Sequence, residues 1–146
     1  MPRFSRSVFV AASIGKVFGF HQREDALQLL SPPFPPLHVI RKTGGIEPGA
    51  IVKLRIGPIP WVALHTAFQQ NVCFEDMQVE GPFASWKHRH AFQAVEAGTI
   101  LTDTVDYTLP GGPLTGAIAA PFIHLALVRM FAHRHAVTKH YCESAG

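Results

Sequence analysis

The chain has 146 residues, the size of one ordinary domain, so we expect residues 1–146 to form a single unit with its own core. Hydrophobic residues make up 47% of the chain and charged residues 16%, which excludes a disordered protein and indicates a sparsely charged surface. The formal net charge is +3 and the basic residues form no cluster, so no nucleic-acid partner is expected. Cys73 and Cys142 belong to no CxxC pair, which argues against a disulfide scaffold or a zinc ribbon.

Two apolar stretches are candidates for a leader or a membrane segment. The run 8–12 follows two arginines but is shorter than the apolar region of a secretory signal, so a first β-strand fits it better. The stretch 116–131 contains a proline, a histidine and an arginine, and it is too short and too polar to span a bilayer. We therefore predict a cytoplasmic protein without stable membrane insertion.

The first part of the chain predicts a strand followed by two short helices. Residues 3–12 are rich in Phe and Val, which favour strands. Ser13 is a suitable N-cap for a first helix, because the apolar residues of 14–18 recur at helical spacing. A second helical run over 23–30 ends where the proline-rich connection 31–36 begins, since a residue before proline avoids the α region.

The middle of the chain predicts strands only. Six segments rich in β-branched and aromatic residues are separated by turns that contain glycine, proline or asparagine. These segments are 37–42, 50–56, 61–69, 72–79, 86–95 and 100–109. Together with the strand at 3–12 they predict one antiparallel, strongly curved sheet.

A long helix is predicted over 115–139, and Pro121 is expected to start it or to kink it. Its apolar face consists of Ile123, Ala126, Leu127, Met130 and Val137. Its other side carries polar residues, and His133 and His135 are expected to be solvated. A helix laid across the concave side of a curved sheet buries its apolar face and leaves room between the two layers. The fold class expected from this order of elements is α+β.

Chemically distinctive residues gather on the inward faces of the last strands. Side chains alternate between the two faces of a strand. The face of 86–95 that is expected to point inward carries Trp86, His88, His90 and Phe92. The inward, apolar face of 100–109 carries Asp103 and Tyr107 among Leu101, Val105 and Leu109. A carboxylate is thus predicted to point into the core.

Turns predict how these strands align. A turn at Gly81-Pro82 would set Phe74 opposite His90, Asp76 opposite His88 and Gln78 opposite Trp86, which are favourable cross-strand pairs. A turn at Ala97-Gly98 would bring Asp103 diagonal to His90 and Tyr107 near His88. Five polar groups would then meet in an aromatic interior: Asp76, His88, His90, Asp103 and Tyr107. Because unpaired buried carboxylates are strongly disfavoured, we expect the two histidines to be their partners.

Three interpretations of this cluster remain open. It could be a structural hydrogen-bond network, it could orient the polar end of an apolar ligand in a cavity, or its histidines could bind zinc. A metal is the least favoured of the three, because His-x-His pairs are common and no third histidine is in register, so we expect no metal and no cofactor. A nucleophilic triad is not expected, since Ser31 and Ser85 lie in turns without a GxSxG context.

The stretch 74–110 resembles a known family. It reads Phe74-x-Asp76-x-Gln78-x-x-Gly81-Pro82-Phe83-x-x-Trp86-x-His88-x-His90-x-Phe92, and then Thr99-x-Leu101-x-Asp103-x-Val105-x-Tyr107-x-Leu109-Pro110. This pattern is similar to the ligand-binding branch of the SRPBCC superfamily, also called START-like or Bet v-like, which includes polyketide cyclases. The resemblance implies a helix-grip fold, in which a seven-stranded antiparallel sheet wraps a long C-terminal helix, two short helices close one end, and a deep cavity lies between. Lys87 and Arg89 beside the histidines depart from the pattern.

Two functions follow as expectations. The first is the binding or carrying of a small hydrophobic molecule, aromatic or lipid-like, in the internal cavity. The second is a cyclase or dehydratase reaction on a polyketide-like substrate, with His90 and Asp103 as the acid/base pair and His88 and Tyr107 as further catalytic candidates. The residues expected to contact the ligand are Trp61, Phe74, Asp76, Gln78, Trp86, His88, His90, Phe92, Asp103 and Tyr107. The low charge fraction also allows an interaction module or a homodimer.

Overall fold

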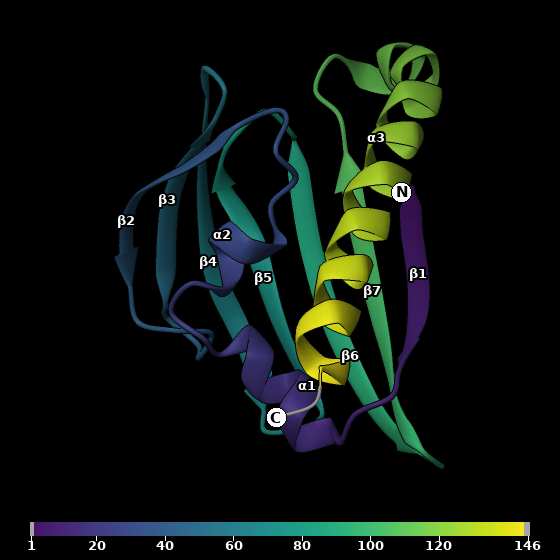
Figure 1. The fold of residues 1–146 in the computed structure, drawn as a ribbon. Helices are drawn as coiled ribbons and strands as arrows, with labels where there is room; N and C mark the ends of the chain where they lie inside the picture. The colour runs from purple at the N-terminus through teal and green to yellow at the C-terminus, as the bar shows by residue number, and fades with distance from the viewer. Residues whose placement is uncertain (1, 145–146) are drawn as a thin grey trace.

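The structure is a computed structural model, and it describes residues 2–144. Seven strands form one antiparallel sheet, which two short helices and one long C-terminal helix accompany (Figure 1). In chain order the elements are β1 (Arg3–Val10), α1 (Ile14–His21), α2 (Ala26–Leu30), β2 (Leu37–Thr43), β3 (Ile51–Ile56), β4 (Ile59–Gln69), β5 (Cys73–Glu80), β6 (Ser85–Val95), β7 (Gly98–Thr108) and α3 (Gly112–Glu143). The predicted α+β helix-grip fold is confirmed.

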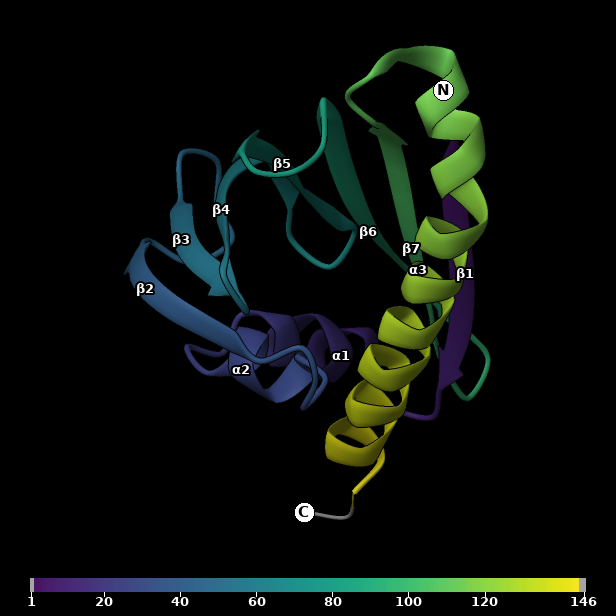
Figure 2. The same ribbon diagram turned by 90° about the horizontal axis from the view of Figure 1, so that it is seen from above.

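The sheet is a series of consecutive hairpins, and the N-terminal strand is added at one edge. Its order is β1-β7-β6-β5-β4-β3-β2, so β1 pairs with the last strand and every other neighbour is consecutive in the chain. Seen from above, the sheet is strongly curved, with α3 on one side and the short helices on another (Figure 2). This curvature leaves the concave face only partly covered by helices.

The short helix α1 fills one end of this concave face. Ser13 caps it as predicted, because its hydroxyl accepts a hydrogen bond from the backbone N–H of Lys16 at 3.3 Å. Val17 and Phe18 are fully buried, and Phe18 meets the ring of Phe92 at a centroid distance of 4.9 Å. The helix therefore covers the end of the concave face near Phe92 of β6.

Helix α3 is longer than predicted at both ends. Pro113 lies in its first turn, where the missing N–H of proline costs nothing, and Gly112 already belongs to it. Pro121 lies inside the helix, and its first turns run at an angle to the rest (Figure 1). The later turns bury Leu127 and Phe131, and Phe131 stacks on Phe4 of β1 at 5.4 Å between ring centroids. This contact fixes α3 along the β1 side of the sheet.

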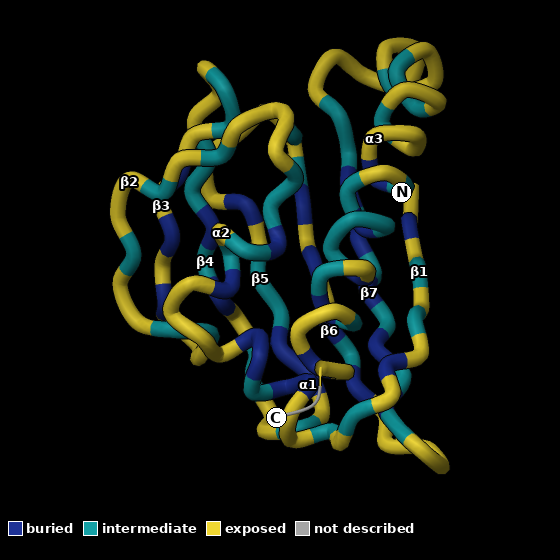
Figure 3. Tube along the Cα trace, in the orientation of Figure 1, coloured by how far each residue is buried: buried dark blue, intermediate teal, exposed yellow. Residues whose placement is uncertain are grey.

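The first half of α3 keeps a stripe of apolar side chains exposed. Within residues 2–144, α3 is the one helix whose length and composition suit a membrane span, with a mean hydropathy of 1.6 over an 18-residue window of which 11% is buried. Length and composition are a weak indication, because the core helix of a soluble protein meets the same criteria. The exposed residues of the stripe are Leu114, Ile118, Phe122 and Leu125. Figure 3 shows these turns of α3 as mostly exposed.

Candidate functional site

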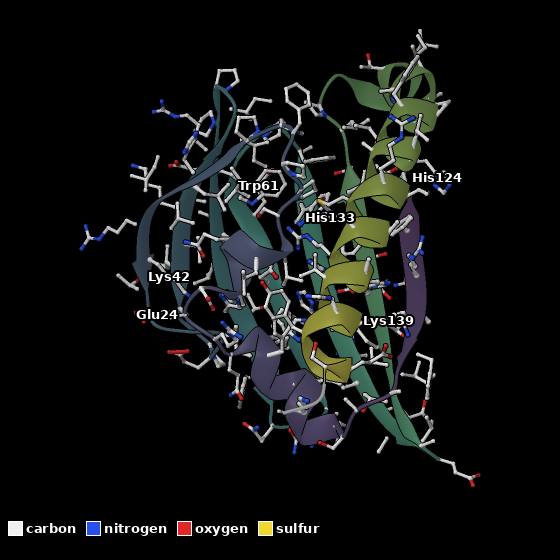
Figure 4. The ribbon with its side chains drawn as sticks, in the orientation of Figure 1. Glu24, Lys42, Trp61, His124, His133 and Lys139 are labelled. Atoms are coloured by element: carbon white, nitrogen blue, oxygen red, sulfur yellow. The ribbon has the colours of Figure 1, made fainter. Side chains whose placement is uncertain are left out.

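A cavity of about 310 Å³ lies between the concave face of the sheet, α2 and α3. Most of its lining is apolar. The apolar walls include Leu27, Leu30, Val52, Leu54, Trp61, Ala63, Phe74, Phe83, Trp86, Ile123, Leu127 and Met130. Figure 4 shows Trp61 over the sheet on the inner side and His124 on the outward side of α3. A cavity of this size and polarity is typical of a small-molecule site.

Polar side chains enter the cavity wall from six elements. They are His21, Lys42, His65, Asp76, His88, His90 and Arg134, with the exposed Arg23 at the edge of α2. Lys42 belongs to the outer part of the lining on the β2 side, where its ammonium donates to the carbonyl oxygen of Glu24 at 3.2 Å (Figure 4). The remaining polar groups converge on the inner faces of β5 and β6, where the histidines are buried.

The register of these strands creates the cluster. Two of the pairs predicted for β5 and β6 are confirmed, Phe74 opposite His90 and Asp76 opposite His88, while the pairing ends at Met77 and does not include Gln78. Asp103 lies directly opposite His90, which corrects the predicted diagonal arrangement. The reason is that Val95 pairs with Gly98, so the turn is one residue earlier than predicted and Gly98 already belongs to β7. A β-carbon on Gly98 would collide with the carbonyl oxygen of Val10, so this strand must begin with glycine.

Asp103 is the centre of the buried network. One carboxylate oxygen accepts a hydrogen bond from Nε2 of His88 at 2.8 Å, and the other accepts from Nε2 of His135 at 2.6 Å. Nδ1 of His90 lies 2.9 Å from the first oxygen, although it is not aligned for a good hydrogen bond. The Asp103 side chain is only 5% exposed. Three imidazoles therefore compensate the charge of one buried carboxylate.

Asp76 faces the same two imidazoles from the opposite side. Its Oδ2 atom lies 3.5 Å from Nε2 of His90 and 3.9 Å from Nδ1 of His88. The rings of His88 and His90 lie 3.8 Å apart between centroids, and His90 stacks on Phe74 at 3.9 Å. These contacts restrict the rotation of both imidazoles, so their nitrogens point at fixed positions in the cavity wall.

Burial and charge move the pKa values of this cluster in different directions. Burial alone would raise the pKa of Asp103, but the charge of His90 and the hydrogen bonds from His135 and His88 hold it well below its ordinary value. Burial lowers the pKa of His88, and the charge of His90 adds to this effect. Burial also opposes protonation of His90, yet Asp103 and Asp76 outweigh it and raise the pKa of His90. The cluster thus holds one imidazole that favours the neutral form beside one that favours the charged form.

Arg134 brings a second cation to the cavity from α3. Its guanidinium lies over the ring of Phe131, 5.7 Å from the centroid, and its Nε has no hydrogen-bond partner among the described residues. Burial lowers the pKa of Arg134, although the charges of Asp103 and Asp76 oppose the shift. Arg134 as a whole is half-buried, and a guanidinium with a buried Nε in a cavity wall is suited to bind an oxygen of a ligand.

The structure divides the ten predicted ligand-contacting residues into two groups. Trp61, Phe74, Asp76, Trp86, His88 and His90 line the cavity. The other four lie outside its lining. Gln78 is held by Phe83, accepting from its N–H at 3.1 Å and donating to its carbonyl at 2.8 Å.

Phe92, Tyr107 and Asp103 lie behind the cavity wall. Phe92 belongs to the core around α1. Tyr107 is directly opposite Trp86 and packs in the core around Phe131. Asp103 acts on the cavity only through the histidines that it binds. Asp103 and Tyr107, both suggested as catalytic residues, could therefore act on a bound molecule only through a neighbouring side chain that lines the cavity.

Sequence reasoning missed four polar residues of this region. The prediction that His135 is solvated is wrong, because its exposed fraction is 2% and it binds Asp103. A signal was present, since His135 follows the buried Phe131 by one helical turn. His65 shares its strand face with Trp61, so period-two alternation could have found it. His21 follows the buried Val17 by one helical turn, so the same signal was present there, and Arg134 lies three residues after the buried Phe131.

With this geometry established, comparison with known proteins identifies the family. A family model described as "Polyketide cyclase / dehydrase and lipid transport" matches residues 10–133. The chain belongs to this polyketide cyclase family. Membership indicates ligand binding or polyketide-cyclase-type function within the SRPBCC fold, and the predicted resemblance is confirmed. No curated protein gave a match.

Solved structures share the fold of this polyketide cyclase family member. A nucleoside-diphosphate sugar epimerase from Corynebacterium glutamicum is 26% identical with a TM-score of 0.74, over 94% of this chain and 28% of that one. A START superfamily protein from Mycobacterium smegmatis is 15% identical with a TM-score of 0.69, over 97% of both chains. The di-domain ARO/CYC protein BexL is 18% identical with a TM-score of 0.72, over 99% of this chain and 51% of BexL. The chain thus spans about a quarter of the epimerase and half of BexL.

Proposed function

We propose that this protein binds one small, mainly apolar molecule in the cavity between the sheet and α3. The observation that carries the proposal is the combination of apolar walls with one polar region, where Asp76, His88, His90 and Arg134 lie together. An apolar ligand would be held by burial of its surface, while a carbonyl or hydroxyl at one end would be oriented by imidazole and guanidinium donors. Membership of a lipid-transport and cyclase family supports this function.

A second function uses the same groups for chemistry. His88 and His90 lie side by side in the wall with their pKa values moved in opposite directions, which is how sites separate an acid from a base. A cyclase or dehydratase could use such a pair on a bound polyketide, with Asp103 positioning both imidazoles. The two functions differ in the fate of the bound molecule. A carrier returns it unchanged, whereas a dehydratase returns it lighter by one water.

A phenyl ring placed inside the cavity is expected to block binding. Ala63 lies on the inner face of β4 and lines the cavity, so Ala63→Phe should fill space that the ligand needs. The neighbouring Val62 lies on the other face, and Val62→Phe is the matched control. Titration with anilinonaphthalene sulfonate, which joins an apolar body to an anionic group, should show saturable fluorescence with the wild type and the control but not with Ala63→Phe. Equal binding by all three proteins would contradict the proposal.

A homodimer through α3 is proposed as the assembly state. A second copy would cover the exposed stripe, in which Phe122 is 74% and Leu114 is 75% exposed. Phe122→Glu places a charge in the middle of the stripe and should convert the dimer to a monomer, while His124→Glu changes an exposed residue of the same helix outside the stripe. Light scattering at several concentrations measures the mass. A wild type that is monomeric at every concentration would contradict the dimer.

A further inference from the structure

Two carboxylates flank the same pair of imidazoles at different distances. On the Asp103 side the nitrogen–oxygen distances are 2.8 Å to His88 and 2.9 Å to His90, which leave no room for an ion. On the Asp76 side they are 3.9 Å and 3.5 Å, which are too long for hydrogen bonds. Two ligand atoms bound to one zinc ion at about 2.0–2.1 Å lie about 3.4 Å apart in tetrahedral geometry. The space beside Asp76 therefore has the dimensions of a metal site.

Hydrogen bonding sets the tautomer that such a site needs. A neutral imidazole has one N–H and one lone pair. His88 donates its Nε2–H to Asp103, so its Nδ1 presents a lone pair towards Asp76. Nδ1 of His90 also lies 2.9 Å from Asp103, although it is less well aligned than Nε2 of His88; with the proton of His90 on this nitrogen, its Nε2 presents a lone pair to Asp76. Two lone pairs and a carboxylate then face one another in a buried place, where only a cation can satisfy all three.

We infer that Asp76, His88 and His90 form a site for one divalent metal ion of the zinc class, bound by Nδ1 of His88, Nε2 of His90 and Oδ2 of Asp76. One ligand atom from each of these three residues lies within 4.8 Å of the other two. Two imidazoles and one carboxylate are a ligand set that zinc accepts, with a further position left for another molecule. The inference departs from the sequence-based expectation of no metal, which counted histidines and did not place Asp76 across from both of them.

The surroundings support the site as well as its ligands. Asp103 accepts a hydrogen bond from Nε2 of His88, as the outer carboxylate does in carboxylate–histidine–zinc arrangements. His135 in turn binds the other oxygen of Asp103 at 2.6 Å. Phe74 fixes the ring of His90 by stacking at an interplanar angle of 11°. All three ligands also line the cavity, so the remaining position on the metal faces the bound molecule. A carbonyl or hydroxyl oxygen is the group that it would take there.

Zinc binding by protein stripped with a chelator tests this inference. Calorimetric titration with Zn²⁺ should show one site per chain, and Asp76→Asn should weaken its affinity by at least about 10–100-fold, the range for loss of even an outer partner. His38→Gln removes an exposed histidine from β2 and should leave the affinity unchanged. Thermal melts of the stripped variants confirm that each is folded. In ¹⁵N spectra of the imidazoles, zinc should shift Nδ1 of His88 and Nε2 of His90.

The site is disproved if Asp76→Asn binds zinc as tightly as the wild type. It is also disproved if zinc shifts the ¹⁵N signals of exposed histidines only, such as His38 and His124. A third contrary result is the absence of zinc binding together with a His90 that carries a proton on both ring nitrogens. The dye titration is run in the presence of chelator. Its outcome is therefore independent, and loss of the metal site would leave the ligand-binding proposal intact.

Discussion

Replacing Asp103 with alanine is expected to lower the free energy of unfolding by about 3–5 kcal/mol, the usual cost of removing one partner from a buried ionic pair. The carboxylate is the shared acceptor for His88 and His135 and the nearest anion to His90. Without it, two buried N–H groups lose their acceptor, and the charged form of His90 loses its main support. Urea denaturation at pH 7 measures the loss.

Asp106 provides the matched control on the same strand. Its carboxylate points outward and binds the guanidinium of Arg3 at the surface, where water replaces a lost partner. Asp106→Ala should therefore cost far less than Asp103→Ala. Equal losses for the two variants would show that the three histidines do not depend on Asp103.

Acid is expected to destabilise the protein strongly between pH 6.5 and pH 4, with His21 as a main cause. Burial, and then the charge of His90, lower the pKa of His21 from 6.5 to about 4. The folded protein keeps this imidazole neutral, with Nδ1 against the carbonyl of Val17 at 2.8 Å, whereas the unfolded chain takes up a proton below pH 6.5. Stability is therefore fully present above pH 6.5 and falls by about 3 kcal/mol as the pH approaches 4.

A variant separates His21 from the other titrating groups. The pKa values of His88 and His65 are also lowered and act in the same direction, while the raised pKa of His90 acts in the opposite one. His21→Phe suits a position between Phe20, Phe74 and Phe92 and removes this titration. Its free energy of unfolding should change less with pH than that of the wild type or of His38→Gln. An unchanged slope would contradict the assignment.

The order of elements and most of the sheet could be predicted because local signals agreed. Prolines and glycines marked the turns, and alternation placed His88, His90 and Asp103 on inward faces, where all three are buried. The β5–β6 register followed from one turn. The β6–β7 register differs from the prediction because the turn comes one residue earlier and Gly98 is the first residue of β7. Gly98 packs so closely against the carbonyl oxygen of Val10 that a β-carbon would collide with it, and local sequence does not show this contact with a distant strand.

The site was harder to predict than the fold. Alternation showed which side chains point inward but not which ones meet empty space, so Phe92 and Tyr107 were expected in a cavity that other core residues fill. The cavity depends on how α2 and α3 are placed over the concave face of the curved sheet. His135 was missed because an imidazole on a polar stretch of helix suggests solvent, whereas its acceptor comes from a strand 32 residues away in sequence.

The central claim is that one small molecule occupies the cavity beside Asp76, His88 and His90. Native mass spectrometry of protein purified from its own host tests it most directly. We expect a bound small molecule on the wild type and on Val62→Phe, and none on Ala63→Phe. Identical spectra without any bound molecule for all three proteins would contradict it.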